Sequence, residues 1–346
     1  MAKTALVIGG SGQIGRAAVP ALVADGWDVR VLTRGRRGPA DELRAWGAEP
    51  VVGDRHDAGS LAAAVRGGVD VVVDVVGYDD RDAEALLRHA DDIGSAVVVS
   101  SAAVYVDDRG DGFESDTFGT FPVPIGEDQP TVPPGRDSYA TGKVALEQAW
   151  AASPIRTTIL RPGAIHGPGC IQPREWVFVK RALDGRDVRV LAYDGQSRFH
   201  PTSTAVLGEL VRLAAARPAN RVLNAVDPDA PTVAEIASLV DGVMGTTSRI
   251  VRLPGAPHDG VGATPWAVPT PLVLDMSRAH DLLGYVAPGG YGDTVAAAVE
   301  WLVDVAAGKD WREVLPGFAR MEGDGDFFDY AAEDTLLAEG GAQVDG

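Results

Sequence analysis

The sequence predicts an α/β protein built on a doubly wound parallel sheet, with a smaller α/β lobe toward the C-terminus. Short apolar runs, such as residues 5–8 and 69–76, indicate buried strands and alternate with segments of helical periodicity. Glycines spaced by three between positions 9 and 15 separate the first strand from the first helix. At 346 residues the chain exceeds one typical domain, which favours a second lobe.

The first strand, its glycine turn and a helix at residues 14–23 come first along the chain. Gly9 permits the tight exit from the strand, Gly12 allows close approach of the backbone to a pyrophosphate, and Gly15 allows helix and strand to pack closely. A diphosphate would lie at the helix N-terminus, where unpaired N–H groups and the helix dipole favour negative charge. The turn predicts a dinucleotide site in a Rossmann-type fold; a turn without ligand is the alternative.

The second strand, residues 28–33, ends at Arg34. An acidic residue at this point binds the ribose 2′-hydroxyl of NAD, whereas arginine accommodates the 2′-phosphate of NADP. The sequence therefore favours NADP over NAD. Arg36 and Arg37 either join this contact or belong to the solvated surface.

Acidic residues follow or interrupt the next two strands. The strand at residues 49–52 precedes Asp54, which either binds the adenine end of the cofactor or caps the helix around Ser60. Asp74 interrupts the fourth strand, 69–76. A carboxylate inside such an apolar run lies either at the ligand edge of the sheet or in an ion pair.

A helix at residues 138–147 carries the chemical signal. Tyr139 and Lys143 project from one face, one turn apart. An adjacent ammonium lowers the pKa of a phenol, which suits Tyr139 to proton relay, and Lys143 can also bind the nicotinamide ribose. The strand at 96–100 opens into serines, one of which can hold a substrate oxygen. Tyr139, Lys143 and one of these serines together predict hydride transfer with a nicotinamide cofactor.

In combination these motifs resemble the extended short-chain dehydrogenase/reductases, also called the NAD-dependent epimerase/dehydratase family. The matching segments cover about the first half of the chain and lie at 9–15, 53–54, 100–105, 139–143 and 160–169. The resemblance implies that Ser101 is the catalytic serine and that Pro162 and Ile165 contact the cofactor. Shorter pieces, at 33–36, 53–57, 70–74 and 326–337, resemble more weakly a branch containing chloroplast stem-loop RNA-binding proteins.

Two departures from the family pattern have consequences. Dehydratases of the family carry Asp-Glu after the catalytic serine or threonine, whereas this chain has Ala102 and Ala103, which disfavours dehydration. The usual glycine after the Val-Tyr pair is replaced by Val106, so we expect a different path for the following loop. That loop, 106–137, is rich in proline and acidic residues and is typical of a lid, a binding loop or a disordered segment.

The second half is expected to form most of the small lobe. We predict helices at 176–183, 204–216, 233–244 and 292–307 and strands at 157–160, 188–191, 222–225 and 250–253, the strand at 157–160 being the sixth of the sheet and the others belonging to the lobe. The predicted domains are a dinucleotide-binding domain at 1–170 that includes the lid-like loop, a substrate lobe at 171–321 with some segments returning to the first domain, and an acidic tail at 322–346. Arg198 and His200 either meet an anionic group or support a loop, and His166 is expected to be structural.

Composition limits the partners. The formal net charge of −18 disfavours nucleic acid and anionic membranes. Cys170 is the single cysteine, which rules out an internal disulfide and suits a reducing cytoplasm. The sequence shows no signal peptide, no run of membrane-spanning length and no metal-ligand spacing of histidines. We therefore expect a cytoplasmic protein, and the family habit implies a homodimer.

The leading prediction is an NADP- or NAD-dependent oxidoreductase acting at a secondary alcohol or ketone of a small molecule. A sugar-nucleotide epimerase with retained NAD, and a non-catalytic dinucleotide- or RNA-binding protein, remain as alternatives. The predicted catalytic residues are Ser101, Tyr139 and Lys143, with no metal. The predicted cofactor-binding residues are Gly9, Ser11, Gly12, Gln13, Ile14, Gly15, Arg34, Asp54, Arg55, Val75, Val76, Gly77, Tyr139, Lys143, Pro162 and Ile165.

Overall fold

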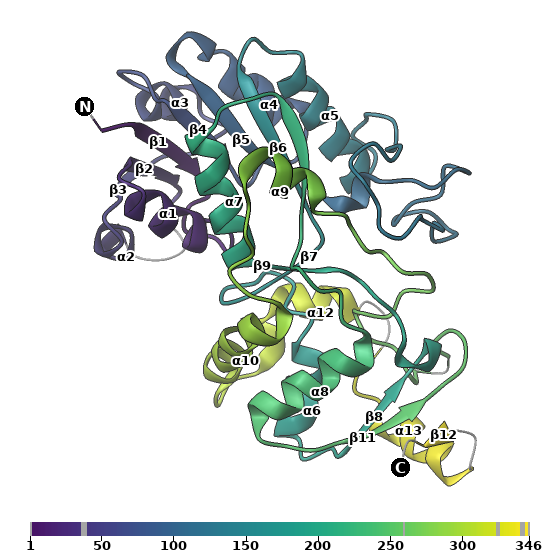
Figure 1. Ribbon diagram of the computed structural model, residues 1–346. Coiled ribbons are helices and arrows are strands. Elements are labelled where there is room, and N and C mark those ends of the chain that lie inside the picture. The colour runs from purple at the N-terminus through teal and green to yellow at the C-terminus, as the bar shows by residue number, and fades with distance from the viewer. Residues whose placement is uncertain (1, 36–39, 259, 323–325, 340–342, 345–346) are drawn as a thin grey trace.

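The computed structural model describes residues 2–35, 40–258, 260–322, 326–339 and 343–344. The chain forms two halves, a sheet covered by helices on both faces and a smaller, mainly helical lobe, which lie above and below one another in Figure 1. Arg36 and Arg37, for which the sequence left two roles open, lie outside the described residues.

The larger half contains a seven-stranded parallel sheet in the order β10-β6-β5-β4-β1-β2-β3. From β1 the chain adds β2 and β3 on one side of the sheet and then β4 and the later strands on the other side. This change of side makes the sheet doubly wound and creates a crevice at the carboxyl ends of β1 and β4. This architecture confirms the predicted fold class. The strands are β1 (Thr4–Ile8), β2 (Asp28–Thr33), β3 (Glu49–Val52), β4 (Val71–Asp74), β5 (Ser95–Val99), β6 (Arg156–Pro162) and β10 (Arg221–Ala225).

The two faces of the sheet are buried under different helices because successive strand residues point to opposite faces. Ala5 and Val7 of β1 pack in one apolar cluster, whereas Leu6 and Ile8 pack in another. The first cluster includes residues of α1 (Gly15–Ala24), α2 (Ala40–Ala45), α7 (Thr204–Ala216) and α9 (Ser277–Leu283). The second includes residues of α3 (Ala58–Ala64), α4 (Asp80–Leu87) and α5 (Tyr139–Ala151).

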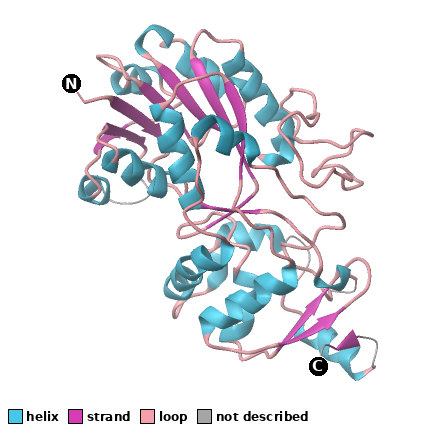
Figure 2. Ribbon diagram, in the orientation of Figure 1, coloured by secondary structure: helices cyan, strands magenta, loops and turns pink. Residues whose placement is uncertain are grey.

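The smaller half has its own core, in which helices pack beside a short sheet (Figure 2). Its principal helices are α6 (Trp176–Leu183), α8 (Val233–Met244) and α10 (Tyr291–Ala306), followed by α11 (Trp311–Val314), α12 (Pro316–Glu322) and α13 (Tyr330–Ala338). Its sheet has the order β12-β11-β8, from Gln343–Val344, Arg249–Arg252 and Val188–Leu191. A two-stranded ladder of β7 (Ala164–His166) and β9 (Pro201–Ser203) lies where the halves meet (Figure 1).

The C-terminal segment packs on the smaller half through α13. Glu333 is buried and forms ion pairs with Arg181 at 2.7 Å and with Arg186 at 3.1 Å. Phe327 and Phe328 pack against the ring of Phe318. The aromatic residues of the predicted acidic tail therefore dock on the body of the protein.

Several sequence-based boundaries are wrong. The strand expected at 222–225 within the lobe is β10, which pairs with β6 at the edge of the large sheet. The helix before it, α7, likewise covers the large sheet and packs with α1. Residues 79–93, which the sequence predicts as one acidic helix, form α4 (Asp80–Leu87) and a separate 3₁₀ turn, η1 (Ala90–Asp92). The proposed domain limits themselves stay a prediction.

The loop at 106–137 is held by its own hydrogen bonds. Asp107 is buried and accepts backbone N–H bonds from Arg109, Asp111 and Thr120 at 2.9 to 3.0 Å. Farther along, Ile125 is fully buried and its N–H donates to the carbonyl of Val273 at 2.7 Å. Whether the segment moves as a lid stays a prediction.

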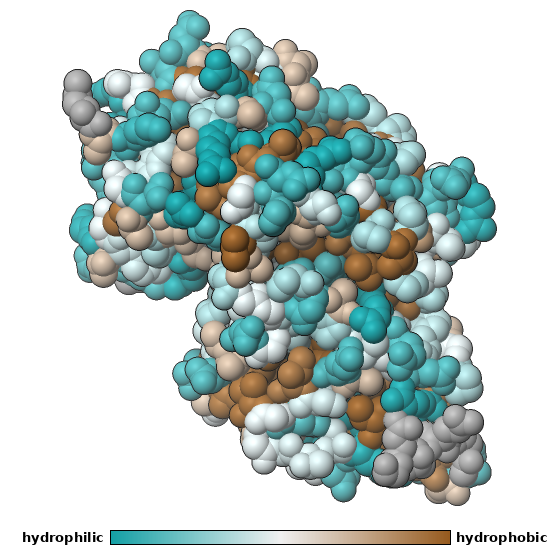
Figure 3. Space-filling model, viewed as in Figure 1, coloured by the Kyte–Doolittle hydropathy of each residue, from teal (hydrophilic) through white to brown (hydrophobic). Residues whose placement is uncertain are grey.

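The surface agrees with the acidic composition. Hydrophilic side chains cover most of the face seen in Figure 3, and hydrophobic side chains gather there only in smaller patches. Within the described ranges, no helix combines the length and the apolar character needed to cross a membrane.

Candidate functional site

The glycine turn after β1 has the geometry that a dinucleotide requires. Gly9 has φ +87°, and a Cβ there would lie 2.6 Å from Val76 Cγ1. A Cβ on Gly15 would lie 2.3 Å from the Cα of Gly10, so the helix and the turn touch through backbone. Gly12 differs, because an added Cβ would meet only the carbonyl oxygen of Gly9, at 3.3 Å. No side chain caps the start of α1, so this end of the helix is left for an anionic ligand.

The end of β2 carries no carboxylate. Thr33 Oγ1 lies 3.4 Å from Ser11 Oγ and accepts a 3.3 Å hydrogen bond from the N–H of Gly35. Arg34 follows and is exposed. A hydroxyl, a cation and the glycine turn thus lie together beside the start of α1.

Asp54 has a different local role from the helix cap that the sequence left open. Its carboxylate accepts the N–H of His56 at 2.9 Å, within the turn after β3. Asp57 caps α3 instead, by accepting the N–H of Ser60 at 2.7 Å. The capping alternative for Asp54 is therefore wrong, because the helix begins three residues later than that role would need.

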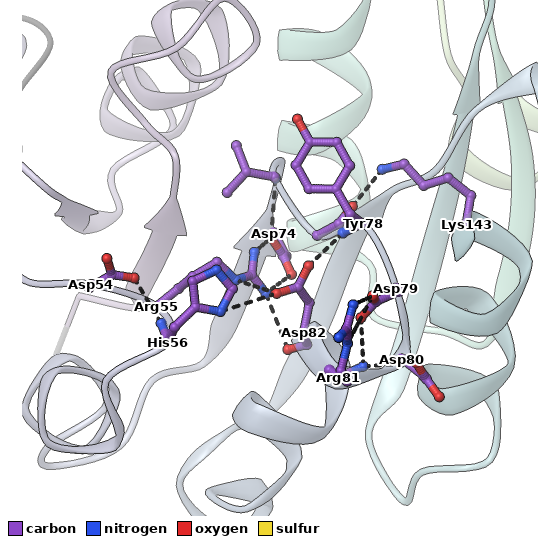
Figure 4. A network of polar contacts seen from close by, with 12 residues as sticks. Asp54, Arg55, His56, Asp74, Tyr78, Asp79, Asp80, Arg81, Asp82 and Lys143 are labelled. Atoms are coloured by element: carbon purple, nitrogen blue, oxygen red, sulfur yellow. Dashed lines mark hydrogen bonds and ion pairs between the residues drawn. The ribbon is translucent and has the colours of Figure 1, made fainter. Parts of the chain in front are cut away.

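Arg55 and Asp74 form the buried centre of a polar network (Figure 4). The guanidinium donates to both carboxylate oxygens of Asp74, at 2.8 and 3.0 Å, and to the carbonyl oxygen of Asp82 at 3.1 Å. Its Nε lies 3.1 Å from Asp82 Oδ1, within ion-pair distance but without the alignment of a hydrogen bond. The structure shows both positions considered for Asp74: it is the last residue of β4, at the carboxyl edge of the sheet, and it forms an ion pair with Arg55.

The network fixes the loop that follows β4 (Figure 4). Asp74 accepts the N–H of Val76 at 3.2 Å, and Asp82 accepts the N–H of Tyr78 at 2.7 Å. Gly77 lies between these anchored residues, and its carbonyl accepts a 2.6 Å hydrogen bond from Lys143 Nζ. The predicted cofactor-binding residues Val75, Val76 and Gly77 thereby share one framework with Lys143.

Lys143 is buried beneath the cleft. Its Nζ also donates to the carbonyl of Val99, at the end of β5, at 2.9 Å. It lies 5.6 Å from the ring centroid of Tyr139 and 5.3 Å from that of Tyr78. Burial lowers the pKa of Lys143 to about 8, against the attraction of Asp74. The group is therefore mainly charged at neutral pH and is fixed by two carbonyl groups.

The side chains of Ser101 and Tyr139 both line the cleft and lie close enough for the serine hydroxyl to lower the pKa of the phenol. The preceding serine, Ser100, is buried and donates a hydrogen bond to Glu147 at 2.5 Å. The structure thus leaves Ser101, rather than Ser100, facing the cleft. The Tyr139 residue is 44 % exposed, with its ring at the cleft surface.

The pKa of Tyr139 differs from the expectation. Burial raises the pKa of Tyr139 to about 12, although the nearby Ser101 hydroxyl acts in the opposite direction. The expected lowering by Lys143 is wrong for this state of the protein, because loss of hydration outweighs a cation whose hydrogen bonds point to backbone carbonyls. Tyr139 is consequently a protonated phenol at neutral pH.

Ser101 and Tyr139 line a cleft of about 470 Å³ at the carboxyl edge of the sheet. Both halves contribute to it, and its floor is mixed polar and apolar. The predicted residues among its walls are Gln13, Ser101, Tyr139, Pro162 and Ile165. The others are Tyr78, Ala102, Ala103, Phe113, Glu114, Gly163, Cys170, Ile171, Gln172, Arg174, Phe199 and Leu272.

The histidines and Arg198 lie in structural positions. His166 is fully buried, and its Nε2 lies 2.8 Å from Asp227 Oδ2. His200 Nε2 donates to the carbonyl of Asp227 at 2.8 Å while its Nδ1 accepts the N–H of Leu274 at 3.1 Å. Burial lowers the pKa of His200, which keeps the ring neutral. Arg198 donates to the carbonyl of Ala230.

The two charged residues of the cleft wall, Glu114 and Arg174, were missed by sequence reasoning. Glu114, from the long loop, accepts the N–H of Ala140 at the start of α5 at 2.9 Å. Arg174 precedes α6 and extends into the cleft. Nothing in the local pattern separates these residues from ordinary surface charges, since their position depends on contacts between distant segments.

Comparison with known proteins agrees with this architecture. Residues 1–100 match the NmrA-like family. The UDP-glucose 4-epimerase of Thermotoga maritima, solved with UDP-glucose, has a TM-score of 0.66 and 20% identity, over 87% of this chain and 99% of that one. A dTDP-glucose 4,6-dehydratase of Bacillus anthracis in complex with NAD has a TM-score of 0.64 and 16% identity, over 89% and 99%. The chain therefore has the fold of the extended short-chain dehydrogenase/reductases.

Curated proteins of similar sequence include two chloroplast proteins and a bacterial reductase. It is 25% identical to the chloroplast protein High Chlorophyll Fluorescence Phenotype 244 of Arabidopsis thaliana, over 72% of this chain and 58% of the relative. It is 28% identical to the chloroplast stem-loop binding protein of 41 kDa b of the same plant, over 54% and 49%. The ceramide reductase of Caulobacter vibrioides is 28% identical, over 80% and 83%. The chain thus spans about half the length of the two plant relatives, and the predicted resemblance to their branch is confirmed.

Proposed function

We propose that the protein is an NADP- or NAD-dependent oxidoreductase that acts at a secondary alcohol or ketone carbon of a small molecule. The observation that carries this proposal is the arrangement beside the cleft, where Ser101 and Tyr139 line the same wall and Lys143 Nζ lies 5.6 Å from the centroid of the Tyr139 ring. A bound nicotinamide dinucleotide would supply or accept the hydride. A ceramide reductase among the relatives is consistent with this reaction class.

Each of the three residues has a distinct role in the proposal. The hydroxyl of Ser101 holds the substrate oxygen, and Tyr139 donates a proton to it as a ketone becomes an alcohol. Tyr139 carries its proton at neutral pH and is therefore in the form that donates, but its raised pKa makes it a weaker acid, so the transfer requires a group that stabilises the phenolate. Lys143, charged below a pKa of about 8, stabilises the phenolate that remains.

The cofactor site would include the glycine turn and the loop after β4. Backbone N–H groups at the start of α1 would bind the pyrophosphate, since no side chain of the protein caps that end. Arg34, beside Thr33 at the end of β2, supports NADP over NAD, because a guanidinium complements a 2′-phosphate. The NAD-bound dehydratase with the same fold leaves NAD as the second candidate.

Two tyrosines of the cleft provide a matched test. Tyr139→Phe removes the hydroxyl to which proton relay is assigned, whereas Tyr78→Phe alters a ring that also lies within 6 Å of Lys143 Nζ. We expect Tyr139→Phe to lower kcat by about 10²- to 10⁴-fold in a ketone-reduction assay with NADPH, and Tyr78→Phe to have a small effect. Cofactor affinity, measured by NADPH fluorescence, should stay unchanged in both. Equal activity of the two variants would contradict the assignment.

A sugar-nucleotide epimerase is the second candidate, because epimerases with bound UDP-sugars share the fold over nearly their whole length. Such an enzyme keeps its NAD between turnovers, whereas a reductase exchanges NADPH. NAD that stays with the protein through dialysis, together with interconversion of UDP-sugars, would favour the epimerase. Dehydration remains disfavoured by Ala102 and Ala103, although a dehydratase shares the fold.

The third candidate is an RNA-binding protein without catalysis, since one relative is a chloroplast stem-loop binding protein. The net charge of −18 opposes this candidate, because binding to a phosphate backbone depends on cationic groups. A salt-dependent gel shift of stem-loop RNA by an inactive protein would favour it.

A further inference from the structure

Arg174 is a cation in the cleft with an unusual environment. Its guanidinium carbon lies 5.0 Å from the ring centroid of Phe199 and 5.9 Å from that of Trp266. The two rings constrain the plane of the guanidinium at the cleft wall. Its Nε is buried and has no hydrogen-bond partner, and no carboxylate within the described ranges forms an ion pair with this residue.

The buried arginines of the described chain are neutralised by acidic side chains. Each of them has a carboxylate oxygen within 3.0 Å, in the pairs Arg55–Asp74, Arg161–Glu147, Arg181–Glu333 and Arg189–Asp241. The partly buried Arg30, Arg198 and Arg221 lack such a pair, but they donate hydrogen bonds to carbonyl or hydroxyl oxygens. Arg174 is also partly buried and differs from both groups, because within the described ranges its guanidinium has neither a hydrogen bond nor an ion pair. Its neighbour Glu175 accepts the hydroxyl of Tyr291 at 3.2 Å.

Leaving a cation without an anion is unfavourable in a partly buried position, and burial accordingly lowers the pKa of Arg174. A structure keeps such a group most readily where a ligand supplies the missing charge. The planar fork of a guanidinium complements carboxylate and phosphate oxygens by paired hydrogen bonds. Its donors are available here, because the groups that contact Arg174 in the cleft are aromatic rings.

We propose that Arg174 binds an anionic group of the substrate, a carboxylate or a phosphate, in the same cleft as the proton-relay hydroxyls. The inference rests on the proposed oxidoreductase function and narrows its substrate class. The substrate is then a small oxo or hydroxy compound whose reacting carbon faces Ser101 and Tyr139. Phe113, which lies 5.3 Å from Phe199 between ring centroids, and Leu272 add apolar surface to the cleft wall.

Binding measurements test the proposal independently of turnover. The probes are 4-oxopentanoate, its uncharged counterpart 2-pentanone and inorganic phosphate, titrated by calorimetry into the full chain saturated with NADP⁺. We expect 4-oxopentanoate, phosphate or both to bind, and Arg174→Gln to weaken that binding about 10- to 100-fold, as for hydrogen bonds to charged groups. Preference for one anion identifies the group as carboxylate or phosphate. Affinity for 2-pentanone should not change.

Arg312→Gln is the matched control, because Arg312 also stacks on a tryptophan, Trp311, at 4.3 Å, but lies outside the cleft walls. Arg174→Lys keeps the positive charge without the planar fork, so its phosphate affinity should lie between those of wild type and Arg174→Gln. This second variant also separates loss of charge from loss of folding, which thermal unfolding checks in each protein.

Three results would overturn the proposal. Neither anion binds the wild type, or the anions bind wild type and Arg174→Gln equally well, or Arg174→Gln weakens NADP⁺ binding as much as it weakens anion binding. The Tyr139→Phe variant separates this proposal from the proposed function. Tyr139→Phe should lose turnover and keep its anion binding. If the wild-type protein binds the anion but transfers no hydride, the oxidoreductase assignment alone is refuted. Hydride transfer without anion binding would refute the role of Arg174 alone.

Discussion

Replacement of Arg55 by methionine tests how much the buried network stabilises the larger half. Arg55 is 9 % exposed, and its partners Asp74 and Asp82 are 0 % and 6 % exposed. Methionine fills much of the same volume but leaves the two carboxylates without their cation. Breaking a buried ion pair in this way costs about 3–5 kcal/mol of unfolding free energy, because the remaining charge stays in a poorly hydrated site.

An exposed ion pair at the start of α4, the helix that also contains Asp82, provides the reference. Arg136 donates to both oxygens of Asp80 at 2.8 Å, the same two-bond geometry as Arg55 with Asp74, but its side chain is 49 % exposed. Arg136→Met should therefore cost only about 0–1 kcal/mol. Urea unfolding at pH 7, followed by circular dichroism, measures both differences.

A second substitution at the same ion pair should rescue stability. The double change Arg55→Met with Asp74→Asn removes one uncompensated charge and should restore part of the unfolding free energy. Equal losses for Arg55→Met and Arg136→Met, or no recovery in the double variant, would refute the reasoning.

Two further predictions concern cofactor choice and the long loop. Arg34→Ala should weaken the binding of NADPH more than the binding of NADH, because only NADPH carries the 2′-phosphate. Fluorescence titration measures both affinities. Equal weakening would contradict the assigned contact. Asp107 accepts backbone N–H bonds, above all from Thr120, which lower its pKa from 3.8 to about 2. The Asp107 carboxylate should contribute fully to the free energy of unfolding above about pH 4 and lose this contribution as pH falls through about 2. The difference in unfolding free energy between wild type and Asp107→Asn should therefore close over this range, as measured by urea unfolding. A gap that stays constant would show that the carboxylate charge is not responsible.

Local patterns were sufficient for many elements. The strands of the first half were recognisable because buried parallel strands are continuous apolar runs with glycine or polar exits. The ends of α6 and α7 were also predicted at the observed residues, Trp176–Leu183 and Thr204–Ala216. The assignment of β10 to the lobe failed, because a five-residue strand carries no mark of the sheet that it joins.

The site shows the same division between local and tertiary information. The spacing of Tyr139 and Lys143 placed both residues on one helix face, but the raised pKa of Tyr139 depends on burial by other segments. The ion pair of Arg55 with Asp74 required β3 and β4 to be brought to the same edge of the sheet. Arg174 was missed because its distinguishing property is the lack of an acidic partner, which no window of sequence displays.

The route of the chain affects how this cleft can be altered. β9 runs directly into α7, and β10 leads to α8, so the polypeptide returns to the large sheet before it completes the smaller half (Figure 1). A chimera made at one junction with a relative would exchange an edge strand and a covering helix together with the cleft wall. Recombination of whole modules is thus a poor route to new specificity here, and diversification is expected to proceed through point changes and loop insertions within an intact scaffold.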